Sequence, residues 1–343
     1  MQTLTITSPD DFHLHLRDGA MMRGVVPDSA RQFARAIIMP NLEPPVVTIA
    51  QALEYHGRIK AALPAGSRFE PMMTLFLTDN TTTAELHAAG ESSHIFAIKY
   101  YPAGATTNSE NGVTSIDRIY PLLEVMDEIR LPLLMHGEVT DADIDIFDRE
   151  RVFIERILDP LMQKFVNLPV VFEHITTREA VEYIKQGPDN LAATITPHHL
   201  LLNRNALLAG GLRPHNYCLP VLKAEQHREA IVAAATSGHP RFFLGTDSAP
   251  HFKRAKESAC SCAGIYSAHS AIELYAEIFE QAGRLDRLEN FASRFGADFY
   301  GLPQNSSSIT LEKSDWTVPV ELACGEDSIV PLWSGQTCHW KLK

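Results

Sequence analysis

The feature that most constrains the fold is a repeated alternation of short apolar runs with longer segments of helical periodicity. Eight runs of apolar, β-branched or aromatic residues have the length and composition of buried β-strands. They are Phe12–Arg17, Arg35–Pro40, Pro71–Leu77, Phe96–Tyr101, Pro132–His136, Pro169–His174, Leu191–Pro197 and Arg241–Asp247. Most are separated by segments with apolar residues three and four positions apart, which indicates helices. A strand-helix unit repeated eight times predicts an α/β fold, the (β/α)8 TIM barrel.

Several of the intervening segments show the helical spacing clearly. They include Val47–Ala62, Ile116–Ile129, Ile144–Phe165 and Glu179–Lys185. Thr114 and Thr177 precede two of them, and threonine is a favoured N-cap residue, so we expect both to cap helices.

A chain of 343 residues that is 45% hydrophobic can bury one large core or two smaller ones. The eightfold repeat favours one, so we predict a single catalytic barrel domain over residues 1–343. The last part of the chain contains short β-type pieces, and we expect residues 303–343 to form a C-terminal extension packed on the barrel.

Polar side chains end six of the eight predicted strands. They are His15 with Arg17, Asn41, Lys99, His136, His174 and Asp247. In a parallel barrel the carboxyl ends of the strands meet at one mouth, where enzymes of this fold carry their chemistry. One histidine at a strand end is usually a turn cap, and one lysine usually extends into solvent. Six independent strands with such ends favour a functional site.

His13 and His15 are separated by one apolar residue at the end of the first strand. Side chains alternate along a strand, so both imidazoles point to one side while Leu14 and Leu16 point to the other. This geometry suits the binding of one divalent metal ion. Taken alone, such a pair is more often solvated or hydrogen-bonded than metal-bound.

The candidate ligands do not match a single metal ion. They are His13, His15, His136, His174 and Asp247. A catalytic zinc takes three protein ligands, so this set is too large for one ion and too small for two without a bridge. Lys99 lies in an apolar run, where an unpaired ammonium is costly to bury. A carbamate formed from Lys99 and carbon dioxide would bridge two ions; the alternative is a structural lysine in a salt bridge.

The charge and the cysteines exclude several classes of protein. A formal net charge of −12 argues against binding to a nucleic acid, whose phosphates are usually contacted by lysine and arginine. No stretch resembles a signal peptide or reaches membrane-spanning length, so we expect no membrane contact. The five scattered cysteines do not form a disulfide framework, which favours a cytoplasmic protein with reduced thiols.

The order of these residues resembles that of the binuclear amidohydrolase superfamily. Longer stretches are similar to single-domain bacterial members that interconvert N-carbamoyl-L-aspartate and L-dihydroorotate, and the similarity extends from about residue 8 to about residue 302. These stretches are DFHLHLRDG (11–19), IIMPNLEPPV (37–46), KYYPAGATTNSENGVTS (99–115), HGEVTDADIDIFDRE (136–150), FEHITT (172–177), ATITPHHL (193–200), RPHNYCLPVLK (213–223) and FLGTDSAPH (243–251).

The resemblance implies a centre with two Zn²⁺ ions. His13, His15 and Asp247 would hold the first ion, and His136 and His174 the second. Lys99, as N6-carboxylysine, and a hydroxide would bridge them. The implied reaction is the reversible ring closure of N-carbamoyl-L-aspartate in de novo pyrimidine (UMP) biosynthesis.

In hydrolysis the hydroxide would attack the ring amide carbonyl, polarised by a metal ion. Asp247 would be the catalytic acid and base that moves the proton to the leaving nitrogen.

The substrate of such an enzyme is a small anionic molecule. Arg17 lies two residues past His15 on the same strand face, well placed for a bidentate grip on a carboxylate. The resemblance adds further substrate contacts. These are Asn41, His136, Leu219, His251 and Ala263. Leu219 and Ala263 would act through backbone groups, which leave no signature in the sequence.

The segment Pro102–Gly112 is polar, contains glycine and has short side chains, which predicts a mobile loop at the mouth. The resemblance implies that Thr106 and Thr107 of this flexible loop donate to the substrate and exclude water. It also implies a homodimer.

Two alternatives stay open at this point. One is another cyclic-amide hydrolase or deaminase of the superfamily. The other is a non-catalytic scaffold, such as the related chains that partner aspartate transcarbamoylase; the presence of all six ligands argues against it. Cys260 and Cys262 have no second pair at zinc-finger spacing, and we expect His198 and His199 to be structural.

Overall fold

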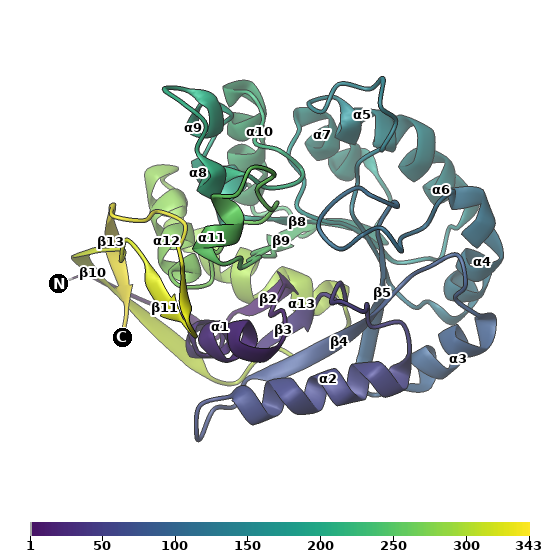
Figure 1. Ribbon diagram of the computed structural model, residues 1–343, viewed down its shortest axis with the longest axis horizontal. Coiled ribbons are helices and arrows are strands. Elements are labelled where there is room, and N and C mark those ends of the chain that lie inside the picture. The colour runs from purple at the N-terminus through teal and green to yellow at the C-terminus, as the bar shows by residue number, and fades with distance from the viewer. Residues whose placement is uncertain (1) are drawn as a thin grey trace.

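The computed structural model describes residues 2–343 and has an eight-stranded parallel barrel at its centre (Figure 1). The strands are β2 Asp10–Leu14, β3 Arg35–Ile38, β4 Glu70–Phe76, β5 Ile95–Tyr100, β6 Leu133–Met135, β7 Val170–Phe172, β8 Leu191–Ile195 and β9 Phe242–Leu244. Their order in the sheet is their order in the chain, and every neighbouring pair is parallel. All eight predicted strands are present, and the TIM barrel prediction is confirmed.

Backbone contacts beyond the last strand close the barrel. Leu14 forms a parallel bridge with Ser248. The amide of His15 donates to the Ser248 carbonyl at 3.1 Å, and the amide of Asp247 donates to the His13 carbonyl at 2.8 Å. The first and last strands therefore meet at the residues for which metal binding is predicted.

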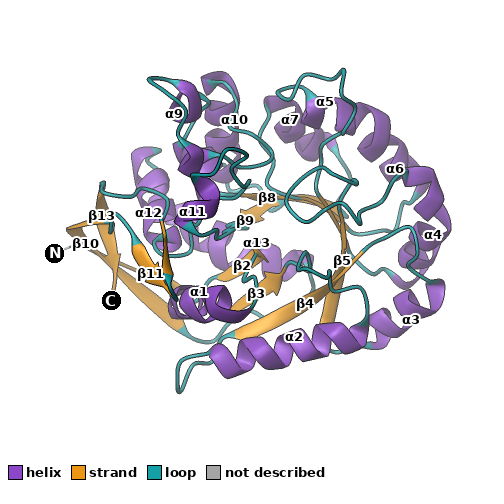
Figure 2. Cartoon of the chain, in the orientation of Figure 1, coloured by secondary structure: helices purple, strands orange, loops and turns teal. Residues whose placement is uncertain are grey.

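Helices surround the barrel, as Figure 2 shows. They are α1 Gly19–Gln32, α2 Ile49–Ala62, α3 Thr83–Glu91, α4 Tyr120–Ile129, α5 Arg149–Phe153, α6 Asp159–Lys164, α7 Arg178–Gln186, α8 Pro197–Leu201, α9 Asn205–Leu208, α10 Glu225–Ala235, α11 Lys253–Lys256, α12 Ala271–Gln281 and α13 Phe295–Phe299. A π-helical turn, Ile154–Leu158, joins α5 to α6, so this helical segment starts five residues later than the predicted Ile144.

The two predicted N-caps have different outcomes. The side chain of Thr177 accepts from the amide of Ala180 and caps α7, as predicted. The prediction for Thr114 is wrong: its hydroxyl donates to Asp79 at 2.6 Å, and the helical turn begins after Ser115. The Thr114 hydroxyl therefore bonds to a carboxylate on a neighbouring loop and does not cap the helical turn.

The barrel interior and the strand-helix layer form two separate apolar cores. The interior is filled by one residue or more from each strand, including Phe12, Ile37, Met72, Ala97, Leu134, Val171, Ala192 and Phe243. Two glycines allow close packing in and around this interior. A Cβ on Gly296 would lie 2.1 Å from the Phe12 ring, and one on Gly245 would lie 2.7 Å from Thr194. The dense interior gives the mouth a rigid floor.

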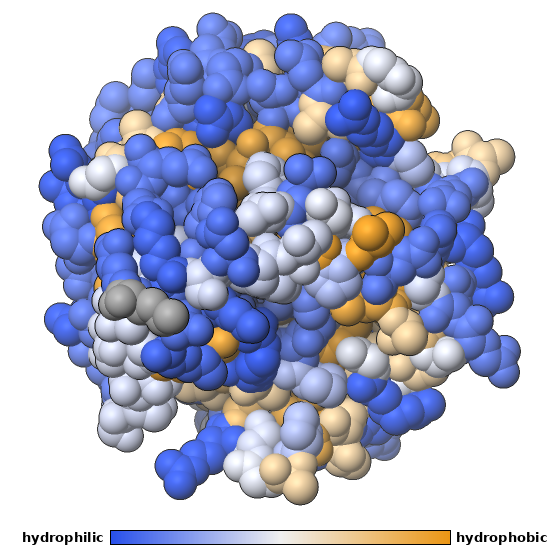
Figure 3. All heavy atoms as spheres, turned by 90° about the vertical axis from the view of Figure 1, so that its left-hand side faces the viewer, coloured by the Kyte–Doolittle hydropathy of each residue, from blue (hydrophilic) through white to orange (hydrophobic). Residues whose placement is uncertain are grey.

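The C-terminal strands lie beside the barrel, near both termini (Figure 1). β10 Ser308–Thr317 pairs with β1 Thr3–Thr7 and with β13 Thr337–Leu342, and β11 Leu322–Cys324 pairs with β12 Asp327–Ile329. Trp340 on β13 is fully buried and donates to Glu280 on α12 at 3.1 Å. The surface on this side is mainly hydrophilic, with smaller apolar patches (Figure 3). No helix in residues 2–343 is both long enough and apolar enough to cross a bilayer.

Candidate active site

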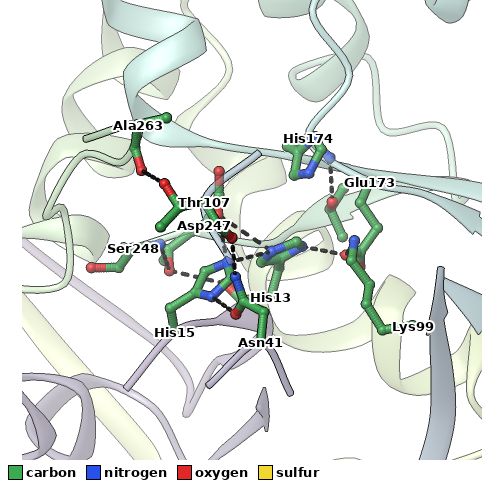
Figure 4. A network of polar contacts seen from close by, with 12 residues as sticks. His13, His15, Asn41, Lys99, Thr107, Glu173, His174, Asp247, Ser248 and Ala263 are labelled. Carbon is green, nitrogen blue, oxygen red and sulfur yellow. Dashed lines mark hydrogen bonds and ion pairs between the residues drawn. The ribbon is translucent and has the colours of Figure 1, made fainter. Parts of the chain in front are cut away.

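The six predicted metal ligands lie at the carboxyl ends of five strands, and all are buried. His13 is on β2 and His15 follows it; Lys99 is on β5; His136, His174 and Asp247 follow β6, β7 and β9. Figure 4 shows most of this group from close by. Strands far apart in the chain thus bring all six side chains to one mouth.

Three of these residues point their ligand atoms at one another. Nε2 of His13 lies 3.2 Å from Nε2 of His15 and 3.3 Å from Oδ1 of Asp247, and His15 Nε2 lies 3.1 Å from the same oxygen. Ligands about 2.1 Å from a tetrahedral ion lie about 3.4 Å from one another. The three atoms therefore have the spacing of ligands around a single ion, and the donor set fits a divalent metal.

The other two histidines lie beside this group, with their rings inclined to one another. The ring of His174 lies 5.1 Å from that of His13 and 4.9 Å from that of His136, measured between centroids. Nδ1 of His174 is buried and has no hydrogen-bond partner within residues 2–343. A buried imidazole nitrogen without a partner is unfavourable, and binding to a metal ion would satisfy it.

Lys99 is completely buried and donates to Oε2 of Glu173 at 2.7 Å. The same carboxylate forms an ion pair with His13. Burial lowers the pKa of Lys99, against the opposing effect of Glu173. Burial alone would lower the pKa of His13, but Glu173 and Asp247 outweigh it and raise the pKa to about 9.

Glu173 is a site residue that the sequence analysis missed. It precedes His174 at the end of an apolar strand. A carboxylate in such an apolar run indicates a buried charged partner, and this was the feature that could have identified it. Tyr101 and Glu138 were also missed: Tyr101 lines the cavity, and Oε2 of Glu138 lies 2.9 Å from Nε2 of His136.

Five of the six residues predicted to bind substrate line the same cavity as the metal-type ligands, and His251 lies just behind its lining. The guanidinium of Arg17 contacts Nε2 of His251 at 3.2 Å and donates to the Pro250 carbonyl, also at 3.2 Å. Asn41 contacts Nδ1 of His15 at 2.8 Å through its Oδ1. Arg17 is thereby held next to the metal-type ligands.

The predicted mobile loop covers this cavity. Asn41 donates to the carbonyl of Thr107 at 3.1 Å, and the Thr107 hydroxyl donates to the Ala263 carbonyl at 3.1 Å. His251 contacts that carbonyl as well, at 2.9 Å. The cavity is lined by His13, His15, Arg17, Asn41, Tyr101, Thr106, Thr107, His136, His174, Leu219, Asp247, Ala249, Ala263 and Gly264.

Three of the site residues have left-handed backbones. Arg17 has a φ of 57°, His174 of 42° and Asp247 of 44°. This conformation costs a residue with a Cβ about 1–2 kcal/mol. Such strain is concentrated at functional sites, where the surrounding structure holds it in place.

A second buried group, His198, His199 and Cys218, also has its ligand atoms close together. Both ring nitrogens of His199 are engaged, however, by the Thr196 hydroxyl at 2.8 Å and by the Pro220 carbonyl at 3.0 Å. The thiol of Cys218 donates to the same carbonyl at 3.3 Å. These contacts agree with the structural role expected for His199. Both ring nitrogens of His198 are buried and have no partner within residues 2–343, so the structural role of His198 stays a prediction. All five cysteines are free.

Comparison with known proteins identifies the class that this fold and site define. The model of the amidohydrolase family matches residues 8–339, and the chain belongs to this family. A dihydroorotase from Cupriavidus necator is 63% identical over 342 residues, which covers 100% of this chain and 99% of the relative. Within the family, the chain belongs to the dihydroorotases.

Solved structures agree with this placement. A dihydroorotase from Campylobacter jejuni is 37% identical, with a TM-score of 0.91 over 99% of this chain and 97% of that one. The Saccharomyces cerevisiae dihydroorotase in complex with 5-fluoroorotic acid is 34% identical, with a TM-score of 0.93 over 100% and 99%. Membership in this family implies a metal cofactor and a small-molecule substrate.

Proposed function

We propose that this chain catalyses the reversible ring closure of N-carbamoyl-L-aspartate to L-dihydroorotate, with loss of water, in de novo pyrimidine biosynthesis. The observation that carries the proposal is the convergence of His13, His15 and Asp247 within 3.3 Å of one another, in a cavity that Arg17 also lines. A metal-type ligand set beside a guanidinium suits hydrolysis of an amide in a substrate that carries a carboxylate.

Two Zn²⁺ ions complete the proposed site. His13, His15 and Asp247 would hold one ion, and His136 and His174 the other, with carboxylated Lys99 shared between them. The ions supply positive charge that polarises the ring amide carbonyl and makes water a nucleophile at neutral pH. The buried, unpartnered Nδ1 of His174 supports a ligand role for this side chain.

Carboxylation of Lys99 requires its neutral amine. Burial lowers the pKa of Lys99 and so favours that form. The amine would attack carbon dioxide, form an N–C bond and release one proton to solvent. The product is an anion with two oxygens, which has the charge and number of donor atoms that a bridge between two cations needs.

The remaining roles belong to side chains around the cavity. In hydrolysis, the carboxylate of Asp247 accepts a proton from the attacking water and delivers it to the ring nitrogen; in ring closure it works in reverse. Arg17 grips the substrate carboxylate with two parallel hydrogen bonds. Asn41 holds the ring of His15 and the backbone of Thr107.

The outer parts of the cavity position the substrate and exclude water. Thr106 and Thr107 donate to the substrate from the loop that covers the mouth. His136 and His251 add side-chain contacts, and Leu219 and Ala263 add backbone contacts. Exclusion of water strengthens each of these electrostatic contacts.

At the level of the whole molecule, we propose one catalytic domain over residues 1–343, with residues 303–343 as an extension packed on the barrel. The pairing of β10 with β1 supports this arrangement. We further propose a cytoplasmic homodimer without a nucleic-acid partner.

The decisive experiment combines metal analysis with the dihydroorotate assay on the wild type and on Lys99→Ala. We expect two zinc ions per chain and turnover in the wild type, and loss of both in the variant. Lys313→Ala is a matched control, because this lysine pairs with Glu280 on the surface and lies outside the cavity. Wild-type metal content and rate in Lys99→Ala would refute the bridging role.

A panel of substrates tests the specificity. Dihydroorotate should be turned over in preference to hydantoin, dihydrouracil and adenosine, since only it offers a carboxylate to Arg17. A preference for hydantoin or dihydrouracil would indicate another cyclic-amide hydrolase. A protein that binds no zinc and ignores carbamoyl aspartate would be a scaffold.

A further inference from the structure

Lys256, outside the set of residues assigned to the reaction, is buried at the end of α11. Its ammonium donates to three backbone carbonyls: Tyr217 at 2.8 Å, Cys262 at 2.6 Å and Gly264 at 2.8 Å. It also lies 5.7 Å from the centre of the Tyr217 ring. A buried cation held by carbonyl oxygens costs desolvation energy, and hydrogen bonds to a charged donor offset that cost.

The three acceptors belong to two segments that form one wall of the cavity. We call residues 217–219 and 262–264 the wall segments. Leu219, Ala263 and Gly264 line the cavity, and Cys262 and Gly264 flank Ala263 on both sides. The amide of Gly264 donates to the Tyr217 carbonyl at 3.0 Å, so the segments also contact each other directly.

The wall segments lie outside regular secondary structure, and Lys256 adds to the few contacts that hold them, which include those of Thr107 and His251 with the Ala263 carbonyl. Within residues 2–343, residues 217–219 and 257–264 contain no helix and no strand. Ser261 has a φ of 53° and Gly264 a φ of 146°, conformations that side chains with a Cβ rarely adopt. The ammonium at their junction adds three hydrogen bonds that reach both segments from one atom.

We propose that Lys256 is a positioning residue for substrate binding, which holds the wall segments so that Leu219 and Ala263 present their backbone groups to the ring edge. The proposal rests on the proposed function, because these two backbones are the predicted ring contacts. Lys256 itself does not line the cavity and has no part in the chemical step.

The test uses Lys256→Met, which keeps an unbranched side chain one atom shorter and removes the charge and all three hydrogen bonds. Loss of hydrogen bonds to a charged group is expected to raise KM for dihydroorotate about tenfold or more. The rate constant kcat should change less than about threefold and zinc content should not change, because the metal-type ligands are untouched. Amide hydrogen exchange should accelerate in the wall segments and not in the barrel strands.

Two further variants make the result specific. Lys253→Met removes a lysine from the same helix that pairs with Glu321 on the surface, and its KM should equal that of the wild type. Lys256→Arg keeps a permanent charge and several donors, and it should restore KM to within about threefold of the wild type. Equal KM values in Lys256→Met and Lys253→Met, or a parallel fall of kcat and zinc content with the rise in KM, would overturn the proposal.

A pH series on the wild-type protein tests the same idea, with Lys256→Arg as the comparison. Burial lowers the pKa of Lys256 to about 8, so the wild type should lose a donor above that pH, and KM should rise. In Lys256→Arg, KM should stay constant over the same pH range. The titratable groups facing the ammonium are Tyr217, Cys218, Cys262, His198 and His251. A Cys262→Ser background removes the contribution of that thiol. Within this background, a pH profile of KM in Lys256→Arg identical to that of the protein with Lys256 would refute the role.

The free energy of unfolding is expected to rise over the pH range in which substrate binding weakens. Because the folded-state pKa of Lys256 is below its ordinary 10.5, the unfolded chain binds more protons between about pH 8 and 10.5. The contribution of this group to the unfolding free energy therefore rises with pH in that window. A rise in KM without a loss of stability separates positioning from a general structural role. Failure of the proposed function is distinct: the wild type would then not turn over dihydroorotate, while hydrogen exchange would still report on the wall segments.

Discussion

Asp11 offers the sharpest test of how the barrel supports the site. This fully buried carboxylate on β2 accepts from the amide of His13 at 3.1 Å, and from the amide and the hydroxyl of Thr246 at 2.8 and 2.6 Å. It thus joins the first strand to the segment after the last one, between His13 and Asp247. Removal of Asp11 should weaken the fold and the metal site together.

The magnitude follows from counting the donors that lose a partner. In Asp11→Ala the Thr246 hydroxyl can turn to the His13 carbonyl, which lies 3.3 Å away, but both amides stay unpaired. A buried donor without a partner costs about 1–3 kcal/mol, so the two amides cost about 2–6 kcal/mol. That is a large part of the about 5–15 kcal/mol by which a typical domain is stable. In Asp11→Asn the amide oxygen accepts from both backbone amides and the amide nitrogen donates to Thr246, so the loss should be about 1 kcal/mol.

The assay is urea unfolding of metal-free protein, followed by zinc content of the purified variants. Asp10→Ala is the matched control, since this neighbouring carboxylate faces Arg35 at the other end of the strand. We expect Asp10→Ala to lower stability and keep its zinc, and Asp11→Ala to lose both. The reasoning fails if Asp11→Ala loses less than about 1 kcal/mol, or if Asp11→Asn loses as much as Asp11→Ala.

Three other predictions concern the contact of Arg17 with the substrate carboxylate, the loop and the packing near the site. Arg17→Lys removes the bidentate grip and should raise KM for dihydroorotate about tenfold to a hundredfold with a smaller effect on kcat, and an unchanged KM would contradict the carboxylate contact. The double variant Thr106→Ala and Thr107→Ala should lower turnover at constant zinc content, whereas wild-type kinetics would remove the loop from the mechanism. Gly137→Ala places a Cβ 1.7 Å from a buried phenylalanine ring and should destabilise the protein by at least about 1–3 kcal/mol in thermal unfolding. Gly57→Ala, in the middle of α2 with open space around its Cβ, is the control and should stabilise by up to about 1 kcal/mol.

Much of the fold could be predicted because its signals are local. Most barrel strands are apolar runs that are buried on both faces. Thr177 caps a helix by a hydrogen bond to an amide three residues later in the chain. Predictions were wrong where a partner from another element intervened. Thr114 donates a hydrogen bond to Asp79, which lies 35 residues earlier in the chain. A pattern over a few adjacent residues contains no information about such a partner.

The candidate site shows the same division. His13, His15 and Lys99 were found because metal-type or cationic side chains stand out in apolar strands. Glu173 was overlooked because its importance depends on Lys99, which is 74 residues away in the chain and 2.7 Å away in space. The metal and substrate roles stay predictions, while the geometry that they need is present.

By itself, the sequence determined the order of strands and helices, the parallel barrel and the set of polar residues at its mouth. These follow from hydrophobic periodicity and from the rule that carboxyl ends of parallel strands meet. Only the tertiary structure decided which atoms face one another: the three ligand atoms of His13, His15 and Asp247, the pairing of Lys99 with Glu173, and the ammonium of Lys256 at the junction of the wall segments. The physical reason is that hydrogen bonds and ion pairs act over about 3 Å, and barrel closure brings such groups together from positions that are far apart in the chain.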